Sequence, residues 1–134
     1  MRTIKFRGKR VDTDEWVFGF YDGCYDSATV NYLKNGIPWN ACVDSETVGE
    51  FTGLRDKNGV EIYEGDILYV IEFDGEKQME YESPVEWIDY GWVVTEPDGI
   101  EVSLALVDSH IQWVNTLIEI KVIGNIYDNP ELLT

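Results

Sequence analysis

The stretch that most constrains the fold is residues 51–73, FTGLRDKNGVEIYEGDILYVIEF, in which two turns alternate with two apolar runs. Asn58-Gly59 is a dipeptide that readily adopts the left-handed backbone of tight hairpins. Gly65 gives the second turn the same freedom. Because the run 67–71, ILYVI, carries β-branched or aromatic side chains on both faces, we predict a strand that is covered on both sides.

The chain before this stretch also alternates strand and turn signals. Residues 4–7 alternate apolar with basic side chains, and 16–21 return with three aromatic rings on one face, which predicts a hairpin. Asn35-Gly36, between the apolar runs 28–34 and 37–43, is the strongest short-range hairpin signal in the sequence. A helix through 44–50 is conceivable, but its Thr, Val and Gly residues favour extended chain.

The chain after residue 73 also alternates strand and turn signals. Ser83-Pro84 is expected to divide 78–90 into two short strands, and Gly91 is expected to allow a turn before the next strand. Pro97-Asp98-Gly99 is a turn because proline fixes φ and glycine accepts a positive value. Pro130 suits the first position of a final helical turn.

Many short strands between Gly-containing turns predict an all-β protein of antiparallel hairpins. We expect a small Src-homology-3-like barrel in the C-terminal two thirds and a short helical turn at the C-terminus. A length of 134 residues suits one domain, which we divide into an N-terminal hairpin lobe, 1–45, and a barrel, 46–134.

Three separated segments carry a resemblance to a known family. They are RTIKFRGKR at 2–10, FTGLRDKNGVEIYEGDIL at 51–68 and IKVIGNIYDNPELL at 120–133. Together they resemble the YopX family of phage and prophage proteins. The resemblance implies a compact, mainly β protein encoded on phage or prophage DNA, and it brings no catalytic residues. The residues that we assign to the structural motif are Gly53, Asp56, Asn58, Gly59, Tyr63, Gly65, Asp66, Gly124 and Pro130.

Charge is the most unusual bulk property, since 26 acidic against 10 basic residues give a formal net charge of −16. Half of the basic residues lie in the first ten positions, as Arg2, Lys5, Arg7, Lys9 and Arg10. An acidic body repels phosphate, so DNA or RNA binding is disfavoured there. The basic strand is a possible interaction site, either for an acidic protein surface or, as a weaker alternative, for nucleic acid.

Motifs for catalysis and metal binding are missing from the sequence. One histidine, His110, and two cysteines without C-x-x-C spacing make a zinc site improbable, and no phosphate-binding or nucleophile motif occurs. Glu61, Glu64 and Asp66 could in principle converge as an acid–base pair or a magnesium site. The competing interpretation is that short acidic side chains accept hydrogen bonds from turn amides. We therefore predict a protein that is not an enzyme and has no cofactor.

Location and partners follow from what remains. No apolar run reaches the length of a membrane span and the start lacks the apolar centre of a signal peptide, so we expect the bacterial host cytoplasm. The leading hypothesis is a protein-interaction module, with at most two of the five Trp residues in the interface. The alternative is an acidic DNA mimic that inhibits a host nucleic-acid-binding protein. We also expect a homo-oligomer, because open sheets leave exposed edges.

Overall fold

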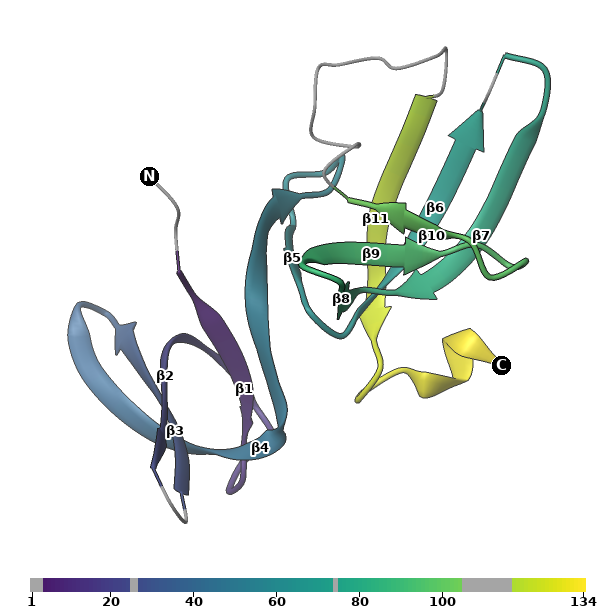
Figure 1. Cartoon of the computed structure of the whole chain (residues 1–134). Coiled ribbons are helices and arrows are strands. Elements are labelled where there is room, and N and C mark those ends of the chain that lie inside the picture. The colour runs from purple at the N-terminus through teal and green to yellow at the C-terminus, as the bar shows by residue number, and fades with distance from the viewer. Residues whose placement is uncertain (1–3, 25–26, 74, 105–116) are drawn as a thin grey trace. The chain divides into compact units, whose positions relative to one another are not determined.

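The computed structural model describes residues 4–24, 27–73, 75–104 and 117–134, and these residues form two compact units (Figure 1). Unit 1 is Met1–Gly53 and unit 2 is Leu54–Thr134. The strands up to the boundary are β1 (Phe6–Arg10), β2 (Trp16–Cys24), β3 (Ser27–Lys34) and β4 (Ile37–Arg55), the last of which crosses it. The strands of unit 2 are β5 (Glu61–Tyr63), β6 (Asp66–Phe73), β7 (Gln78–Pro84), β8 (Glu86–Ile88), β9 (Gly91–Thr95), β10 (Glu101–Ser103) and β11 (Leu117–Asn125).

The prediction of an antiparallel all-β fold is confirmed. Every strand pair for which a register is known runs antiparallel. The single helical element among the described residues is a 3-10 turn, η1 (Pro130–Leu133), which begins at the proline as expected. Residues 44–50 are extended within β4, as their composition favours. No helix among the described residues has the length and apolarity to span a membrane.

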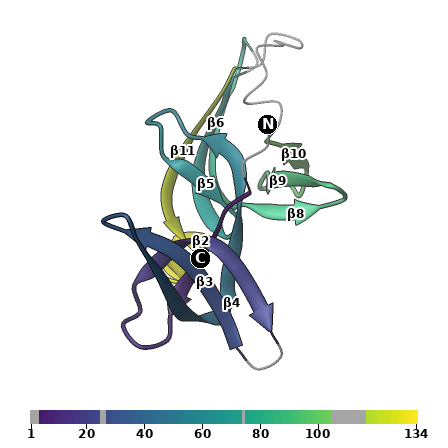
Figure 2. The same cartoon turned by 90° about the vertical axis from the view of Figure 1, so that its left-hand side faces the viewer.

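In unit 1, four strands close into a small ring. The sheet order is β1-β2-β3-β4-β5, and the ring arises because β1 also pairs with β4 (Figure 2). Asn35 and Gly36 both have positive φ and join β3 to β4 in the predicted hairpin. Where the β1–β4 register shifts, the Lys9 N–H donates instead to Thr47 Oγ1 at 2.9 Å. The ring therefore has no open edge along β1, which lies between two partners.

The interior of this ring is too narrow for large side chains. Its buried core consists of Val17, Ala28, Val30, Ala41 and Val43. Two glycines on the pleats let the strands approach even closer. A Cβ on Gly8 would lie 2.9 Å from Val43 Cγ2, and one on Gly19 would lie 1.9 Å from the carbonyl oxygen of Asn31. Trp16, Phe18 and Phe20 of β2 lie on the strand face opposite the buried Val17.

Unit 2 has two three-stranded sheets, with orders β11-β6-β7 and β10-β9-β8, and the second runs across the first in Figure 1. The backbone of Val85 bonds to Gly65 and Asp66, and the Leu104 N–H donates to the Trp92 carbonyl, so the unit is a partial, barrel-like ring. Its core contains Ile62, Leu68, Val70, Tyr81, Val85, Val94, Leu104 and Ile120. Burial on both faces of β6 confirms the prediction for 67–71.

Two turns in unit 2 differ from what the sequence predicts. The turn expected at Gly91 lies one step earlier: Asp89 and Tyr90 both have positive φ, and Gly91 begins β9 opposite Ile88. Gly59 takes the left-handed backbone expected of the Asn58-Gly59 pair, and Asn58 does not. His110 and Trp113 lie outside the described residues.

Candidate functional site

The carboxylates of the central stretch serve the backbone. Asp56 Oδ1 accepts hydrogen bonds from the N–H groups of Asn58 at 2.8 Å and Val60 at 2.9 Å. Its Oδ2 accepts the N–H of Val122 in β11 at 2.9 Å. Burial alone would raise the pKa of Asp56, but these three N–H donors outweigh it and lower that pKa. Asp56 thus joins the 56–60 turn to β11, where Val122 lies 66 residues further along the chain. We call this connection the Asp56 latch.

Asp66 and Glu61 accept hydrogen bonds from two different groups of Tyr63. Asp66 is buried and its Oδ2 accepts the Tyr63 N–H at 2.8 Å, which is the turn role expected of it. Glu61 accepts the Tyr63 hydroxyl at 3.1 Å and lies 3.5 Å from Arg55. Among the described residues, no group of three His, Cys, Asp or Glu side chains is arranged to hold a metal ion.

The remaining motif glycines and Pro130 have identifiable structural positions. Gly53 and Gly65 have φ of 87° and 88°, in the left-handed region where a side chain is strained. A Cβ on Gly124 would lie 2.6 Å from Asn129 Oδ1, just before Pro130 begins η1. The motif residues therefore position turns and close approaches.

The basic residues of the first strand are engaged with side chains of unit 1. Lys5 lies over the Phe51 ring at 5.3 Å, and Arg7, which is buried, lies over the Trp16 ring at 4.7 Å. Lys9 lies 6.0 Å from the same Trp16 ring. This use of positive charge is cation–π packing within the unit.

Arg10 binds an acidic neighbour, and Arg2 lies outside the described residues. The Arg10 guanidinium donates to both carboxylate oxygens of Asp12, at 2.8 and 2.7 Å, and to the Tyr32 hydroxyl at 3.2 Å. The bond to Asp12 is the main cause of the raised pKa of Arg10, and the bond from Arg10 lowers the pKa of Asp12. This bidentate pair occupies the face of the guanidinium that a phosphate would use.

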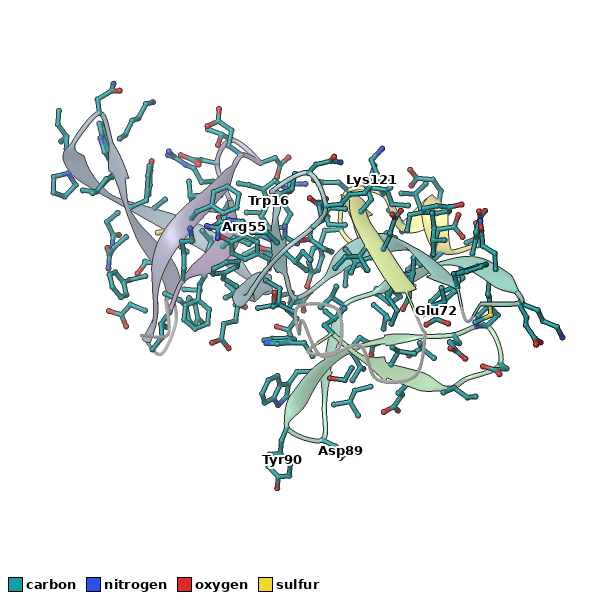
Figure 3. The ribbon with its side chains drawn as sticks, turned by 90° about the horizontal axis from the view of Figure 1, so that it is seen from above. Trp16, Arg55, Glu72, Asp89, Tyr90 and Lys121 are labelled. Atoms are coloured by element: carbon teal, nitrogen blue, oxygen red, sulfur yellow. The ribbon has the colours of Figure 1, made fainter. Side chains whose placement is uncertain are left out.

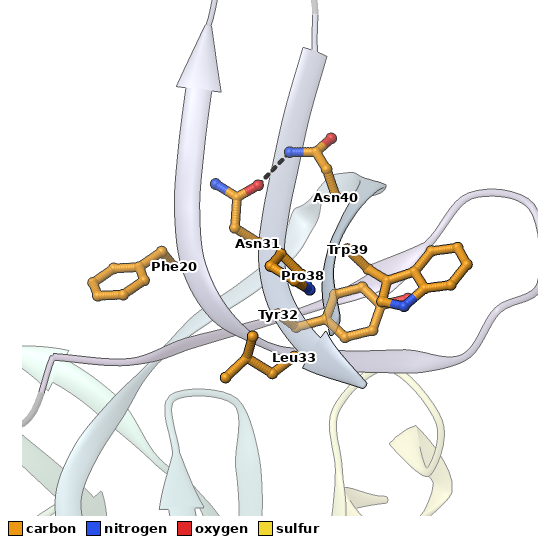
Figure 4. A pocket seen from close by; sticks show the side chains of 7 residues that line it. All are labelled: Phe20, Asn31, Tyr32, Leu33, Pro38, Trp39 and Asn40. Carbon is orange, nitrogen blue, oxygen red and sulfur yellow. Dashed lines mark hydrogen bonds between the residues drawn. The ribbon is translucent and has the colours of Figure 1, made fainter. Parts of the chain in front are cut away.

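An apolar groove of about 440 Å³ lies on the hairpin of β3 and β4 (Figure 4). Its lining residues are Phe20, Asn31, Tyr32, Leu33, Pro38, Trp39 and Asn40. The large apolar members remain open to solvent, with exposed fractions of 68% for Phe20, 72% for Leu33 and 50% for Trp39. Among the residues that the structure describes, no charged side chain lines the groove, so it is suited to an apolar ligand surface.

Two amide side chains that line the groove are hydrogen-bonded to each other. The Asn40 side chain donates to the Asn31 side chain across the β3–β4 ladder, where the two residues are direct partners (Figure 4). The pair keeps further donor and acceptor capacity for a bound peptide, because each amide has more hydrogen-bonding positions than one bond uses. Sequence reasoning placed most aromatic residues in the core and did not identify this groove.

Glu96 of unit 2 interacts with Glu72 and Asp98. The Tyr81 hydroxyl donates to Glu72 Oε1 at 2.9 Å. A hydrogen bond with Glu72, followed by burial and the charges of Glu72 and Asp98, raises the pKa of Glu96 to about 7. Figure 3 labels Glu72 beside β11. Glu96 therefore holds its proton in the folded chain at a pH where an ordinary glutamate is ionised.

Because the pKa of Glu96 is raised, we predict that its contribution to the free energy of unfolding falls as pH rises. A carboxyl whose folded pKa is raised stabilises the fold below its unfolded pKa, and that stability is lost as pH rises towards about 7. Glu96→Gln should match the wild type at pH 4.5 and exceed its urea midpoint at pH 8. Glu101→Gln, an exposed carboxylate on β10, serves as the control. Equal midpoint differences for Glu96→Gln at both pH values would contradict the prediction.

Comparison with known proteins gives a family and a fold. The profile described as YopX protein matches residues 5–134. The crystal structure of protein EF1440 from Enterococcus faecalis is similar, with 25% sequence identity, a TM-score of 0.52 and full coverage of both chains. No curated protein matches the chain significantly.

Proposed function

The chain belongs to the YopX protein family, and from that premise we propose that it is a phage or prophage accessory protein that binds a host or phage protein. It has no enzymatic activity in this proposal, and it acts in the bacterial cytoplasm. The resemblance to a phage family supports the first part, and the lack of a catalytic motif in the sequence supports the second. A turnover abolished by substituting Glu61, Glu64 or Asp66 would refute the non-enzymatic part.

The observation that carries the proposal is the apolar groove on the β3–β4 hairpin. Exposed aromatic side chains that are fixed on strands are the usual anchors of protein interfaces, because they bury a large area at little cost in conformational entropy. Trp39 and Phe20 have this character. The Asn31–Asn40 amide pair, on the same strand face as Phe20, supplies polar contacts that fix the orientation of a ligand.

Substitution of the groove residues tests this proposal. The full chain, Trp39→Ala and Leu33→Ser are used to capture proteins from host lysate at two salt concentrations, and a captured protein is then purified and titrated directly. Both side chains are largely exposed, so both variants should fold. We expect a discrete partner whose affinity falls about tenfold or more in Trp39→Ala and changes little with salt. Undiminished binding by both variants would refute the groove as the site.

The second candidate function is an acidic DNA mimic, and the distribution of charge favours it. Unit 2 contains 18 of the 26 acidic residues and four of the ten basic ones, a net charge of −14. Such a field steers a basic partner to the acidic surface at low salt. The mimic hypothesis predicts basic DNA-binding partners that are released steeply as salt rises, and that bind Trp39→Ala as well as the wild type.

Nucleic-acid binding through the first strand is the weaker alternative. A gel-shift titration at physiological salt, with Lys5→Gln and Lys9→Gln as variants, tests it. We expect no shift, because Arg7 and Arg10 are engaged with Trp16 and Asp12. A shift that these variants abolish would favour this alternative over the other two.

Self-association is a further part of the proposal. Sheets that do not close fully leave strand edges that can pair with an identical chain. We expect light scattering to give a mass above 15.4 kDa, and the mass to rise with protein concentration. A particle of 15.4 kDa at high concentration and ordinary salt would refute the homo-oligomer.

A further inference from the structure

The hairpin of β8 and β9 presents aromatic rings to solvent in unit 2. Tyr90, at its tip, is 94% exposed, and Trp87, on β8, is 48% exposed. Figure 3 shows Asp89 and Tyr90 at the end of the hairpin, pointing away from the strands of the unit. The groove described above lies in unit 1, so this surface is a separate one.

The tip holds Tyr90 in an unfavourable backbone conformation. Ile88 pairs with Gly91, which leaves Asp89 and Tyr90 as a two-residue loop with φ of 48° and 71°. Such a loop favours Asn-Gly, and an aromatic residue in the left-handed region is strained. Because Tyr90 is almost fully exposed, packing within the unit does not compensate for the strain. A role for the exposed ring outside the fold explains its presence.

The second ring is held in place by the core. Trp87 and Trp92 are direct partners across the β8–β9 ladder, and their rings meet edge to face at 4.8 Å. Trp92 packs against the buried core of unit 2. Trp87 is thus fixed in orientation although it is half-exposed, and its use in binding loses little side-chain freedom.

Carboxylates accompany these rings. Glu86 and Asp89 are both exposed on the same hairpin. The whole unit carries 18 acidic and four basic residues. An arginine side chain complements this combination, because its planar cation stacks on aromatic faces and pairs with carboxylates.

We propose that the β8–β9 hairpin binds an arginine-bearing segment of a basic protein, with guanidinium groups stacked on Trp87 and Tyr90 and paired with Asp89. A second copy of the chain is a poor occupant, since many of its cations are already engaged: Arg7 and Lys9 lie over Trp16, and Arg10 is paired with Asp12. Arg55 and Lys57 likewise lie beside Glu61 and Glu119. The proposal is independent of the groove, because Trp39→Ala changes only unit 1.

A nona-arginine peptide is the probe for this site. It is titrated by calorimetry into the full chain and into Tyr90→Gly and Asp89→Asn. Glycine and asparagine both accept the left-handed backbone, so both variants keep the turn, and Tyr90→Gly should raise the thermal midpoint while it weakens binding. We expect each variant to bind about 3- to 30-fold more weakly than the wild type.

Two control variants separate the hairpin from the general acidity of the chain. Phe73→Ala removes another exposed aromatic ring of unit 2, and Glu101→Gln removes a carboxylate at the opposite end of β9. Both should bind the peptide like the wild type. The proposal is overturned if Tyr90→Gly and Asp89→Asn bind with wild-type affinity, or if the two controls weaken binding equally, since the peptide would then adhere by net charge alone.

Discussion

Replacing Gly19 with valine is expected to unfold unit 1. A Cβ at this position would lie 1.9 Å from the carbonyl oxygen of Asn31 and 3.2 Å from the Cα of Tyr32. Both obstacles are backbone atoms of β3, so no rotamer change can relieve them. Overpacking of a core typically costs about 1–3 kcal/mol, and we expect at least the upper end here because the β2–β3 ladder itself must separate.

The measurement is amide exchange and backbone NMR spectra of the full chain, which report on each unit separately. Gly91→Ala is the matched control, since Gly91 also lies in a strand but has open space where a Cβ would stand. It should leave stability unchanged or raise it by about 0.4–1 kcal/mol. Native spectra and wild-type exchange in Gly19→Val would show that the close approach of β2 and β3 is not required.

Asp56→Asn is expected to destabilise unit 2 by about 3 kcal/mol, because an asparagine amide nitrogen cannot accept the hydrogen bonds that one carboxylate oxygen accepts now. If the amide nitrogen replaces Oδ2, the Val122 N–H loses its acceptor. If it replaces Oδ1, the N–H groups of Asn58 and Val60 lose theirs. Urea unfolding should show the loss, and the amide protons of these residues should exchange faster than those of the wild type. Equal exchange in the variant and the wild type would contradict the latch.

The control for Asp56 is Glu119→Gln, which removes a carboxylate on the same strand as Val122. Glu119 is exposed and lies 3.8 Å from Lys57, so its loss should cost about 0–1 kcal/mol.

The pH dependence of stability gives a second test of the role of Asp56. A carboxyl with a lowered folded pKa stabilises the fold above its unfolded pKa of 3.8, and that stability is lost as pH falls through the folded value. The difference in free energy of unfolding between the wild type and Asp56→Asn should therefore become smaller as pH falls.

The turns show what local sequence can predict. Asn35-Gly36, Gly65 and Gly99 take the positive φ that their residue types indicate, and the strands on either side begin and end close to the expected positions. Proline positions are equally informative: β7 ends at Pro84 and η1 begins at Pro130. These predictions succeed because backbone preference is a property of one or two residues.

The turn at Asp89 and Tyr90 shows where local preference fails. Glycine was the expected turn residue, yet Gly91 pairs with Ile88 and the less suited tyrosine takes the positive φ. The pairing of Trp87 with Trp92 fixes this register. Ladder pairing along both strands therefore outweighs the preference of a single turn residue.

The groove could not be predicted because its apolar residues show the same sequence pattern as core residues and yet remain exposed. Trp39 and Phe20 occur in the same alternating patterns that fill a core in larger sheets. Trp39 lies on the same strand face as the buried Ala41 and Val43, but beyond the part of β4 that pairs with β1, and its ring stays exposed. Alternation predicts that two faces differ, and the extent of the closed ring decides which residues of one face are covered.

By itself, the sequence determined the class of fold, most turns, the family and the acidic balance of the chain, because each depends on residue type or on short spacing. The tertiary structure decided the closure of β1 onto β4, the latch from Asp56 to Val122 and the exposure of the groove and hairpin rings. Each of these depends on contacts between residues far apart in the chain. Such contacts are selected by packing and by the satisfaction of buried hydrogen-bonding groups, which no local pattern encodes.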